Sequence, residues 1–277
     1  KDEIFGPVLS ILKFKNLDIN AGLSQNHVMC ILQDSKGFMW IGTRDGLNRY
    51  DGYKFTIYKH DVANAKSISS NFITDLREDA KGNIWIATRG GGLNYYNRER
   101  DNFTSFLSNR GGYNSISSDL LKSIAIDKSG KVWIGTEDGG VNTFDPVTKQ
   151  FTRFVHKPED PRSIGTNVIQ CVFADHEDNL WVGTYGKGLY LFDRKSRSFN
   201  RVEDKNKIIR ADEIIWHIFE DSKNQLWLGT LGGGVKQFNP RTGVVQQYSH
   251  EKQNPNSLSI DVVYAIREDN EGNLWVG

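Results

Sequence analysis

The sequence has few of the features that would point to a disulfide scaffold, a membrane helix or a nucleic-acid surface. Its two cysteines, Cys30 and Cys171, are too few for a disulfide framework and lack metal-ligand spacing, so we expect both to be buried thiols. No stretch approaches the roughly 18 apolar residues of a membrane span, and no apolar signal-peptide segment follows Lys1, so we expect the chain as given to be soluble. The 35 Lys and Arg residues balance 34 Asp and Glu residues without a block of one sign, which argues against nucleic-acid contact.

What the sequence does have is a tandem repeat. Six of its seven tryptophans follow one another at spacings of 45, 48, 48, 46 and 48 residues, and each opens a phrase such as Trp40-Ile41-Gly42-Thr43. We assign these tryptophans to structure, packed between neighbouring sheets: Trp40, Trp85, Trp133, Trp181, Trp227 and Trp275. The predicted repeats span approximately residues 23–66, 67–114, 115–162, 163–209, 210–256 and 257–277, the last of them truncated.

Each repeat is predicted to form four short strands. An Asp stands six residues before each Trp and begins a polar turn such as Asp34-Ser35-Lys36-Gly37, typical of a hairpin between two strands. A third apolar segment follows the Gly-rich bend after the Trp phrase. The fourth segment pairs apolar residues three apart, such as Phe103 and Phe106, which we interpret as a strongly twisted or bulged strand.

Four antiparallel strands per repeat, without an intervening helix, predict an all-β fold, a β-propeller of four-stranded antiparallel blades. We treat residues 1–277 as one incomplete propeller with five complete repeats and part of a sixth, and expect the intact domain to extend beyond Gly277. Residues 1–22 are predicted to supply an N-terminal strand that closes the last blade, because Leu12-Lys13-Phe14 lies before Gly22 as Ile57-Tyr58 lies before Ser67. Six or seven blades would fit this count.

The Trp-Ile-Gly-Thr phrase, the upstream Asp turn and the crossover Ser67-Ile68-Ser69 resemble the two-component regulator propeller repeat over nearly the whole chain. The run from Gly22 to Leu47 is similar to the first blade of the sensor region of hybrid two-component systems from Bacteroides-type bacteria. WD-repeat proteins match less well, because Gly-Thr rather than Asp follows the Trp motif.

The resemblance implies a function that the residues alone do not show. It implies a seven-bladed propeller in the periplasm, followed in the full-length protein by a second propeller, an immunoglobulin-like domain, a membrane span, a histidine kinase, a receiver and a DNA-binding module. The expected ligand is an oligosaccharide, and the expected receptor is a homodimer that reaches the membrane only through its full-length chain. No kinase His, receiver Asp or recognition helix is assigned in this chain, so we expect it to be no enzyme and to need no cofactor.

The catalytic alternative is a propeller-fold glycosidase or lyase. The acidic residues recur at the same turn position in every repeat, which turn chemistry explains better than one active site. The histidines show no metal-ligand spacing, and we expect His60, His156 and His250 to be solvated at the ends of fourth strands. We therefore assign no catalytic and no metal residues. A structural or dimerisation propeller is the other alternative.

A ligand is expected on the face where first strands begin and second strands end, at positions that differ between repeats. Eleven residues before each Trp stand Met29, Thr74, Lys122, Gln170, Trp216 and Tyr264, and four residues after it stand Arg44, Arg89, Glu137, Tyr185 and Leu231. Our candidate ligand-binding residues are Arg44, Arg89, Lys122, Glu137, Tyr185, Trp216 and Tyr264. The aromatic residues would stack on a sugar ring and the basic residues would bind hydroxyls, carboxylates or sulfates. In the alternative interpretation the aromatic residues fill the channel mouth, the basic residues are solvated, or the face docks another domain.

Overall fold

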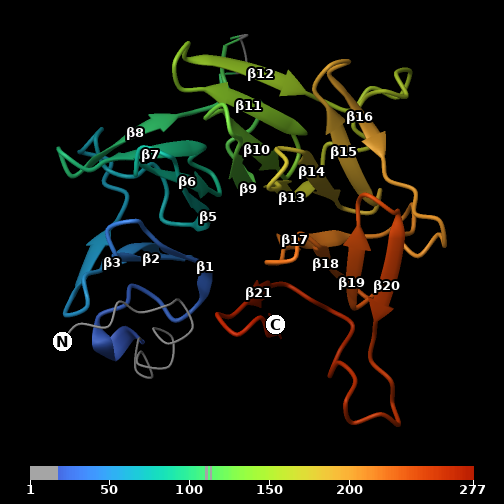
Figure 1. Cartoon of the computed structure of the whole chain (residues 1–277). Helices are drawn as coiled ribbons and strands as arrows, with labels where there is room; N and C mark the ends of the chain where they lie inside the picture. Colours follow the sequence, from blue (N-terminus) through green and yellow to red (C-terminus); the bar gives the residue numbers. More distant parts are fainter. Residues whose placement is uncertain (1–17, 110–111, 113) are drawn as a thin grey trace. The chain divides into compact units, whose positions relative to one another are not determined.

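The computed structural model describes residues 18–109, 112 and 114–277, which form β-strands with almost no helix (Figure 1). The exception is η1 (Ile19–Ala21), a 3-10 helix whose N-cap Asp18 accepts hydrogen bonds from the backbone N–H groups of Asn20 and Ala21. This segment is not a strand, and the predicted closing strand around Leu12 to Phe14 lies outside the described residues.

The strands form sheets in which chain neighbours pair antiparallel in simple sequence order. The first three sheets are β1 (Val28–Gln33), β2 (Met39–Thr43), β3 (Gly46–Tyr50) and β4 (Phe55–Tyr58); β5 (Ile73–Glu78), β6 (Ile84–Thr88), β7 (Leu93–Asn97) and β8 (Asn102–Phe106); β9 (Leu121–Ile126), β10 (Val132–Thr136), β11 (Val141–Asp145) and β12 (Gln150–Phe154). The next are β13 (Ile169–Ala174), β14 (Leu180–Thr184), β15 (Leu189–Asp193) and β16 (Ser198–Arg201); β17 (Ile215–Glu220), β18 (Leu226–Thr230), β19 (Val235–Asn239) and β20 (Val244–Tyr248). The last sheet has two strands, β21 (Ile266–Glu268) and β22 (Leu274–Val276). Four antiparallel strands per complete repeat confirm the predicted blade.

One aspartate in each repeat explains the spacing of six residues to the tryptophan. In the fourth repeat Asp175 Oδ1 accepts the backbone N–H groups of Glu177 and Asn179, which closes the turn between β13 and β14, while Oδ2 accepts the indole N–H of Trp181 at 2.8 Å. The same indole bond recurs in every repeat: Asp34 to Trp40, Asp79 to Trp85, Asp127 to Trp133, Asp221 to Trp227 and Asp269 to Trp275. The carboxylate therefore fixes both the hairpin turn and the orientation of the ring.

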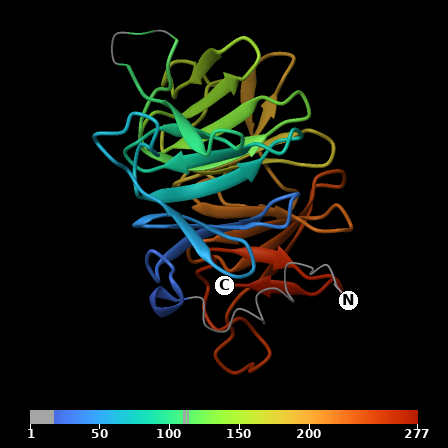
Figure 2. The ribbon, with the colours of Figure 1, turned by 90° about the vertical axis from the view of Figure 1, so that its left-hand side faces the viewer.

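The described chain divides into two compact units. Unit 1 comprises Lys1–Asp138 and Asn142–Arg153, and unit 2 comprises Gly139–Val141 and Phe154–Gly277. Within unit 1 the apolar clusters lie between consecutive sheets. Trp40 and Leu47 pack against Ile73 and Ile84 of the next sheet, and Trp85 packs in the same way against residues of the third. Figure 2 shows these sheets of unit 1 as successive layers, coloured from blue to green.

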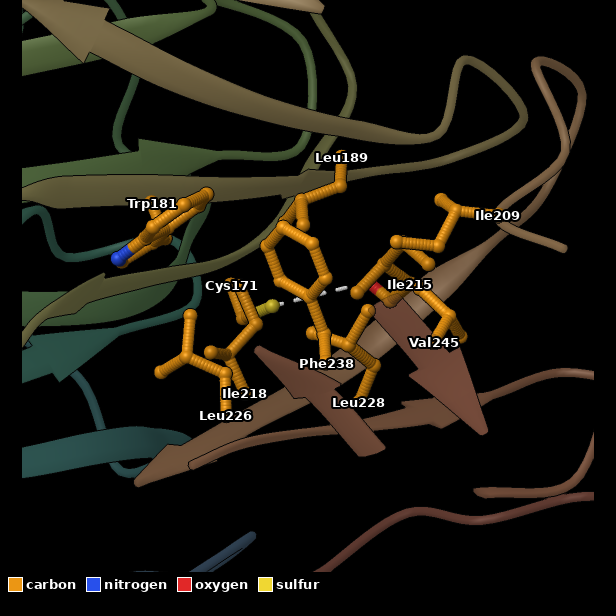
Figure 3. Close-up of a cluster of buried hydrophobic side chains, with 10 residues drawn as sticks. All are labelled: Cys171, Trp181, Leu189, Ile209, Ile215, Ile218, Leu226, Leu228, Phe238 and Val245. Carbon is orange, nitrogen blue, oxygen red and sulfur yellow. Dashed lines mark hydrogen bonds between the residues drawn. The ribbon is translucent and has the colours of Figure 1, made fainter. Parts of the chain in front are cut away.

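The core of unit 2 repeats this packing. Trp181 lies edge-on to Phe238 with ring centroids 5.7 Å apart, and Cys171 lies beside Ile215, toward whose carbonyl its thiol points at 3.6 Å (Figure 3). Four of the repeat tryptophans are buried as predicted, whereas Trp227 is half-buried and Trp275, in the two-stranded sheet, is 61% exposed.

The two cysteines occupy equivalent positions but differ in exposure. Cys171 is buried as predicted, whereas Cys30 is only half-buried, because β1 leaves much of Val28 and Ile31 exposed. The sulfur of Cys30 nevertheless lies against Gly42, and burial raises the pKa of the thiol well above its usual range. A Cβ on Gly42 would lie 2.5 Å from this sulfur, which is why the Trp phrase has Gly at this position.

Of the two alternatives predicted for the fourth strand, twisted or bulged, the bulge is wrong for β4, β8, β16 and β20, whose registers with their neighbours are unbroken. The register shift lies instead between the first and second strand of every complete repeat. Three-apart apolar residues in the fourth strand therefore do not mark an extra residue there.

Candidate functional site

A β-bulge in each first strand singles out one residue. In β17, Ile215 pairs with Thr230 and His217 pairs with Gly229, so Trp216 is the extra residue. The corresponding extra residues are Met29 in β1, Thr74 in β5, Lys122 in β9 and Gln170 in β13. In the sixth repeat the N–H groups of Tyr264 and Ala265 both donate to the carbonyl of Gly277, which is the same local arrangement.

These extra residues are the ones that stand eleven positions before each Trp and differ from repeat to repeat. Bulges locally break the ladder and re-aim a side chain, and they are frequent next to binding sites. In β5 and β17, by contrast, Ile73 and Ile215 of the regular part of the strand are fully buried in the core. The fold thus separates a constant packing pattern from a variable position at the start of the strand.

In unit 1 the predicted residues Arg44, Arg89, Lys122 and Glu137, together with Phe72, form what we call the basic rim. The guanidinium carbons of Arg44 and Arg89 lie 5.5 and 5.7 Å from the centroid of the Phe72 ring. This contact combines two positive charges with one aromatic face. The basic rim carries three positive charges and one negative charge.

Glu137 holds the other two basic groups of this rim. Arg89 forms a two-point ion pair with it, with nitrogen to oxygen distances of 3.0 and 3.1 Å, and Lys122 Nζ lies 3.4 Å from the same carboxylate. Among the described residues no carboxylate lies within ion-pair distance of Arg44, which is exposed. Arg44 is therefore better placed than Arg89 to receive an anionic group from solution.

In unit 2 the predicted residues form what we call the aromatic rim: Tyr185, Trp216 and Tyr264. Trp216 and Tyr264 meet edge to face, with ring centroids 5.0 Å apart and an interplanar angle of 83°. Trp216 is half-buried, while Tyr185 and Tyr264 are 49% and 53% exposed. Tyr185 follows β14, and its N–H donates to the carbonyl of Val168 just before β13. Exposed aromatic rings of this kind offer faces on which a sugar ring can stack.

The structure brings Arg89, Lys122 and Glu137 together in unit 1, joins Arg44 to Arg89 through Phe72, and joins Trp216 to Tyr264 in unit 2. Sequence reasoning missed Phe72. It stands two residues before the bulge residue Thr74, and its carbonyl accepts the N–H of Arg89. This position also varies between repeats, so a comparison of repeats at this offset would have found it.

The remaining acidic and histidine groups are used by the scaffold. The repeat aspartates bind turns and indoles, as described above. The prediction that three histidines are solvated fits the exposed His60 and His250, whereas His156 is half-buried. All three direct Nδ1 to a backbone carbonyl at 2.7 to 2.9 Å. A carbonyl only accepts, so Nδ1 carries the proton in each ring. In the part of the chain that the structure describes, no cluster of His, Cys, Asp or Glu is arranged to hold a metal ion.

Comparison with known proteins supports the assignment of these repeats to a propeller family. The family model described as two component regulator propeller matches residues 22–45, 67–90, 163–186, 210–232 and 257–277. Each match contains the bulge residue and the Asp–Trp pair of its repeat. A stretch of 56 residues is 48% identical to Histidine kinase P4 of Formosa agariphila and covers 20% of this chain and 4% of that protein.

Solved structures confirm the β-propeller fold. The extracellular domain of a B. thetaiotaomicron protein described as a hybrid two component system is 25% identical, with a TM-score of 0.60 over 95% of this chain and 40% of that chain. Virginiamycin B lyase from Staphylococcus aureus, at 13% identity, has a TM-score of 0.65 over 90% of this chain and 77% of that one, a likeness of fold alone. The chain spans 40% of the B. thetaiotaomicron extracellular domain and 4% of Histidine kinase P4, less than half of either protein. None of the described helices has the length and apolarity to cross a membrane.

Proposed function

Because the chain is built from two component regulator propeller repeats, we propose that it is the ligand-sensing propeller of a hybrid two-component receptor. It lies in the periplasm, detects an oligosaccharide and signals to a histidine kinase and a transcription regulator elsewhere in the full-length protein. The histidine kinase relative and the extracellular domain of the hybrid system support this assignment.

One observation carries the proposal that this propeller binds a ligand itself. In every complete repeat the bulge adds one residue, and that residue differs from repeat to repeat. A scaffold would have no reason to keep six different side chains at one structurally identical position. Variable side chains on a constant frame are the arrangement expected of a recognition surface.

The chemistry of the rims favours a saccharide. On the aromatic rim, Trp216 and Tyr264 present ring faces to the apolar face of a pyranose, and their polar groups can bind hydroxyls. On the basic rim, Arg44 supplies an unpaired guanidinium for a carboxylate or sulfate. A neutral sugar unit would match the aromatic rim, and an acidic sugar unit would match the basic rim.

Signalling from such a site requires no chemistry on the ligand. A saccharide that binds two receptor conformations with different affinity shifts their populations by the difference in binding free energy. Catalysis would need a free acid, base or nucleophile, and the recurring aspartates are bound to indoles instead.

The test is a thermal-shift titration of the extracytoplasmic region with neutral, uronic-acid and sulfated oligosaccharides. Trp216→Ala and Arg44→Ala should remove a saturable rise in melting temperature, and Lys36→Ala, at an exposed turn on the other end of the strands, should keep it. A shift that survives both rim variants would move the site to another domain. Turnover of the saccharide would instead establish an enzyme, and no shift with any sugar would leave a structural or dimerisation propeller.

A further inference from the structure

A second surface in unit 1 differs from the rims in place and chemistry. It is a groove of about 370 Å³ next to the turns β5–β6 and β9–β10, which lie at the opposite end of these strands from the rim residues. Trp85, Tyr95 and Phe106 line its apolar side, and Asn83, Thr104 and Lys149 are among its polar residues. We call it the lateral groove.

The apolar side of the lateral groove is built from rings in contact. Tyr95 lies 4.9 Å from Trp85, and Phe106 stacks at 6.2 Å from the same indole, measured between ring centroids. The nearest carboxylate, Asp79, is already bound to the Trp85 indole at 3.1 Å and to the Asn83 amide at 3.0 Å. The groove therefore has an aromatic wall without a free acidic group in its lining.

The repeat supplies an internal comparison, because the equivalent groove between β1–β4 and β5–β8 is filled. There the Arg49 guanidinium lies 5.8 Å from the Trp40 ring and 5.7 Å from the Tyr58 ring, and donates to the Tyr96 hydroxyl at 2.8 Å. Arg98 enters from the neighbouring sheet and lies 2.8 Å from the Asp34 carboxylate. Arg49 and Arg98 thus occupy the space beside Trp40. They pair with the Tyr96 hydroxyl and the Asp34 carboxylate, respectively.

In the lateral groove the same repeat positions hold different residues. Tyr95 stands in place of Arg49, Pro146 in place of Arg98, and Lys149 in place of Asp101. The proline cannot reach across, so the space stays open, and the charge at its edge changes from negative to positive.

Four polar groups in the lining of this space, two ammonium groups and two hydroxyls, have no ion-pair or hydrogen-bond partner among the described residues. Within residues 18–109 and 114–277, the Lys81 and Lys149 ammonium groups have no carboxylate within ion-pair distance. In the same ranges the hydroxyls of Tyr95 and Thr104 have no hydrogen-bond partner. Burial raises the pKa of the Tyr95 phenol, so this hydroxyl is available as a donor.

We propose that the lateral groove is a second saccharide site, which binds one pyranose unit bearing a carboxylate or sulfate. The volume falls within the range of small-ligand pockets, about 300–1,000 Å³. The ring wall receives the apolar face of the sugar, the two lysines bind its anionic group, and the hydroxyls of Tyr95 and Thr104 bind its hydroxyl groups. This site is separate from the rims and can be present whether or not they bind ligand.

The test is calorimetric titration of the purified chain with four probes: a glucuronic-acid disaccharide, its sulfated form, an uncharged glucose disaccharide and a hexaglutamate peptide. Lys81→Ala with Lys149→Ala should weaken binding of the charged probes by about 10- to 100-fold, as expected for the loss of charge-assisted hydrogen bonds. Tyr95→Arg with Pro146→Arg, which restores the filled arrangement, should abolish binding. Lys36→Ala, at an exposed turn outside the groove lining, should leave it unchanged.

Three results would overturn the proposal: unchanged affinity in the lysine variant, equal affinity for the uncharged disaccharide, or tighter binding of a hexaglutamate peptide than of any sugar. If the arginine variant fails to fold, the exposed lysine pair still decides the question. If no thermal shift depends on the rim residues while calorimetry still detects binding in the lateral groove, only the proposal for the rims is rejected.

Discussion

The aspartate of each repeat shows how much one side chain can determine. Its two oxygens have separate tasks, one closing the hairpin turn and one accepting the indole N–H, and this explains why the spacing to Trp is constant while the turn residues vary. A hydrogen bond to an ionised acceptor contributes about 1.5–3 kcal/mol, and a buried donor left unpaired costs about 1–3 kcal/mol.

Replacing Asp175 with Ala should therefore lower the free energy of unfolding by about 2–4 kcal/mol, because Trp181 loses its acceptor and the turn loses two bonds. Urea denaturation followed by tryptophan fluorescence measures this loss. The exposed Asp138→Ala variant serves as the control and should change stability by less than about 0.5 kcal/mol. Equal effects of the two substitutions would contradict the assigned role.

A second feature at the scale of single residues is the buried ion pair of Lys236 and Glu213 in unit 2. Lys236 occupies the strand position that holds Asn48 and Asn94 in other repeats, donates to both carboxylate oxygens and also to the carbonyl of Ile208 at 2.6 Å. Both side chains are almost fully buried, and burial lowers the pKa of Lys236 below its ordinary 10.5.

Lys236→Met alone should cost about 3–5 kcal/mol, since it leaves a buried carboxylate unpaired, whereas Lys236→Met with Glu213→Leu should be close to neutral. Denaturation of both variants measures this difference, and an equally large loss in the double variant would contradict it. In the wild type, the unfolded chain binds more protons than the folded one between the lowered pKa and 10.5, so this group makes stability rise with pH across that window. The double variant should lack that rise.

At the scale of the strand, the bulge gives one residue of a core strand a position outside the regular pairing. Ile215 before the bulge is fully buried, and the extra residue Trp216 takes no place in the regular alternation. Replacing the side chain of Trp216 and deleting the residue should therefore have different effects on the stability of the fold.

Trp216→Ala should preserve the fold and reduce saccharide binding. Deletion of Trp216 would pull β17 out of register and expose Ile215, at a cost of about 2–5 kcal/mol, comparable to truncating a core isoleucine. Circular dichroism and urea midpoints of the two proteins separate the cases. Similar stability of both would show that the strand tolerates the slip and that the bulge is not essential.

At the scale of the whole molecule, the formal net charge is only +1, so electrostatic attraction for an acidic sugar comes from local groups rather than from the overall field. Such attraction between exposed charges is screened by salt, with a Debye length of about 10 Å at 0.1 M and about 3 Å at 1 M. The two kinds of rim should differ in this respect.

Raising sodium chloride from 0.05 to 0.5 M should weaken binding of a sulfated oligosaccharide by about five- to tenfold, and binding of a neutral one by less than about twofold. Titration at both salt concentrations, in the wild type and in Arg44→Ala, tests this. Equal salt dependence of the two sugars would show that the basic rim does not contact the anionic group.

The repeat, the strands, the turns and the family could be read from the sequence because each is local or periodic: the Trp spacing and the Asp turns need no partner far along the chain. The bulges could not, since an extra residue is defined only by the register of two paired strands. Phe72 and the Lys236–Glu213 pair were missed for a similar reason, because their roles depend on groups that only folding brings close. The lateral groove is lined by residues of two consecutive repeats, so its open space depends on how these repeats pack against each other.

The bond from aspartate to indole closes within six residues and therefore within a single repeat. A stretch of DNA that encodes one repeat consequently carries the complete instruction for one turn and one oriented ring. Its duplication or loss would change the size of the gene by one self-sufficient unit, while the residue at the bulge would be free to diverge afterwards.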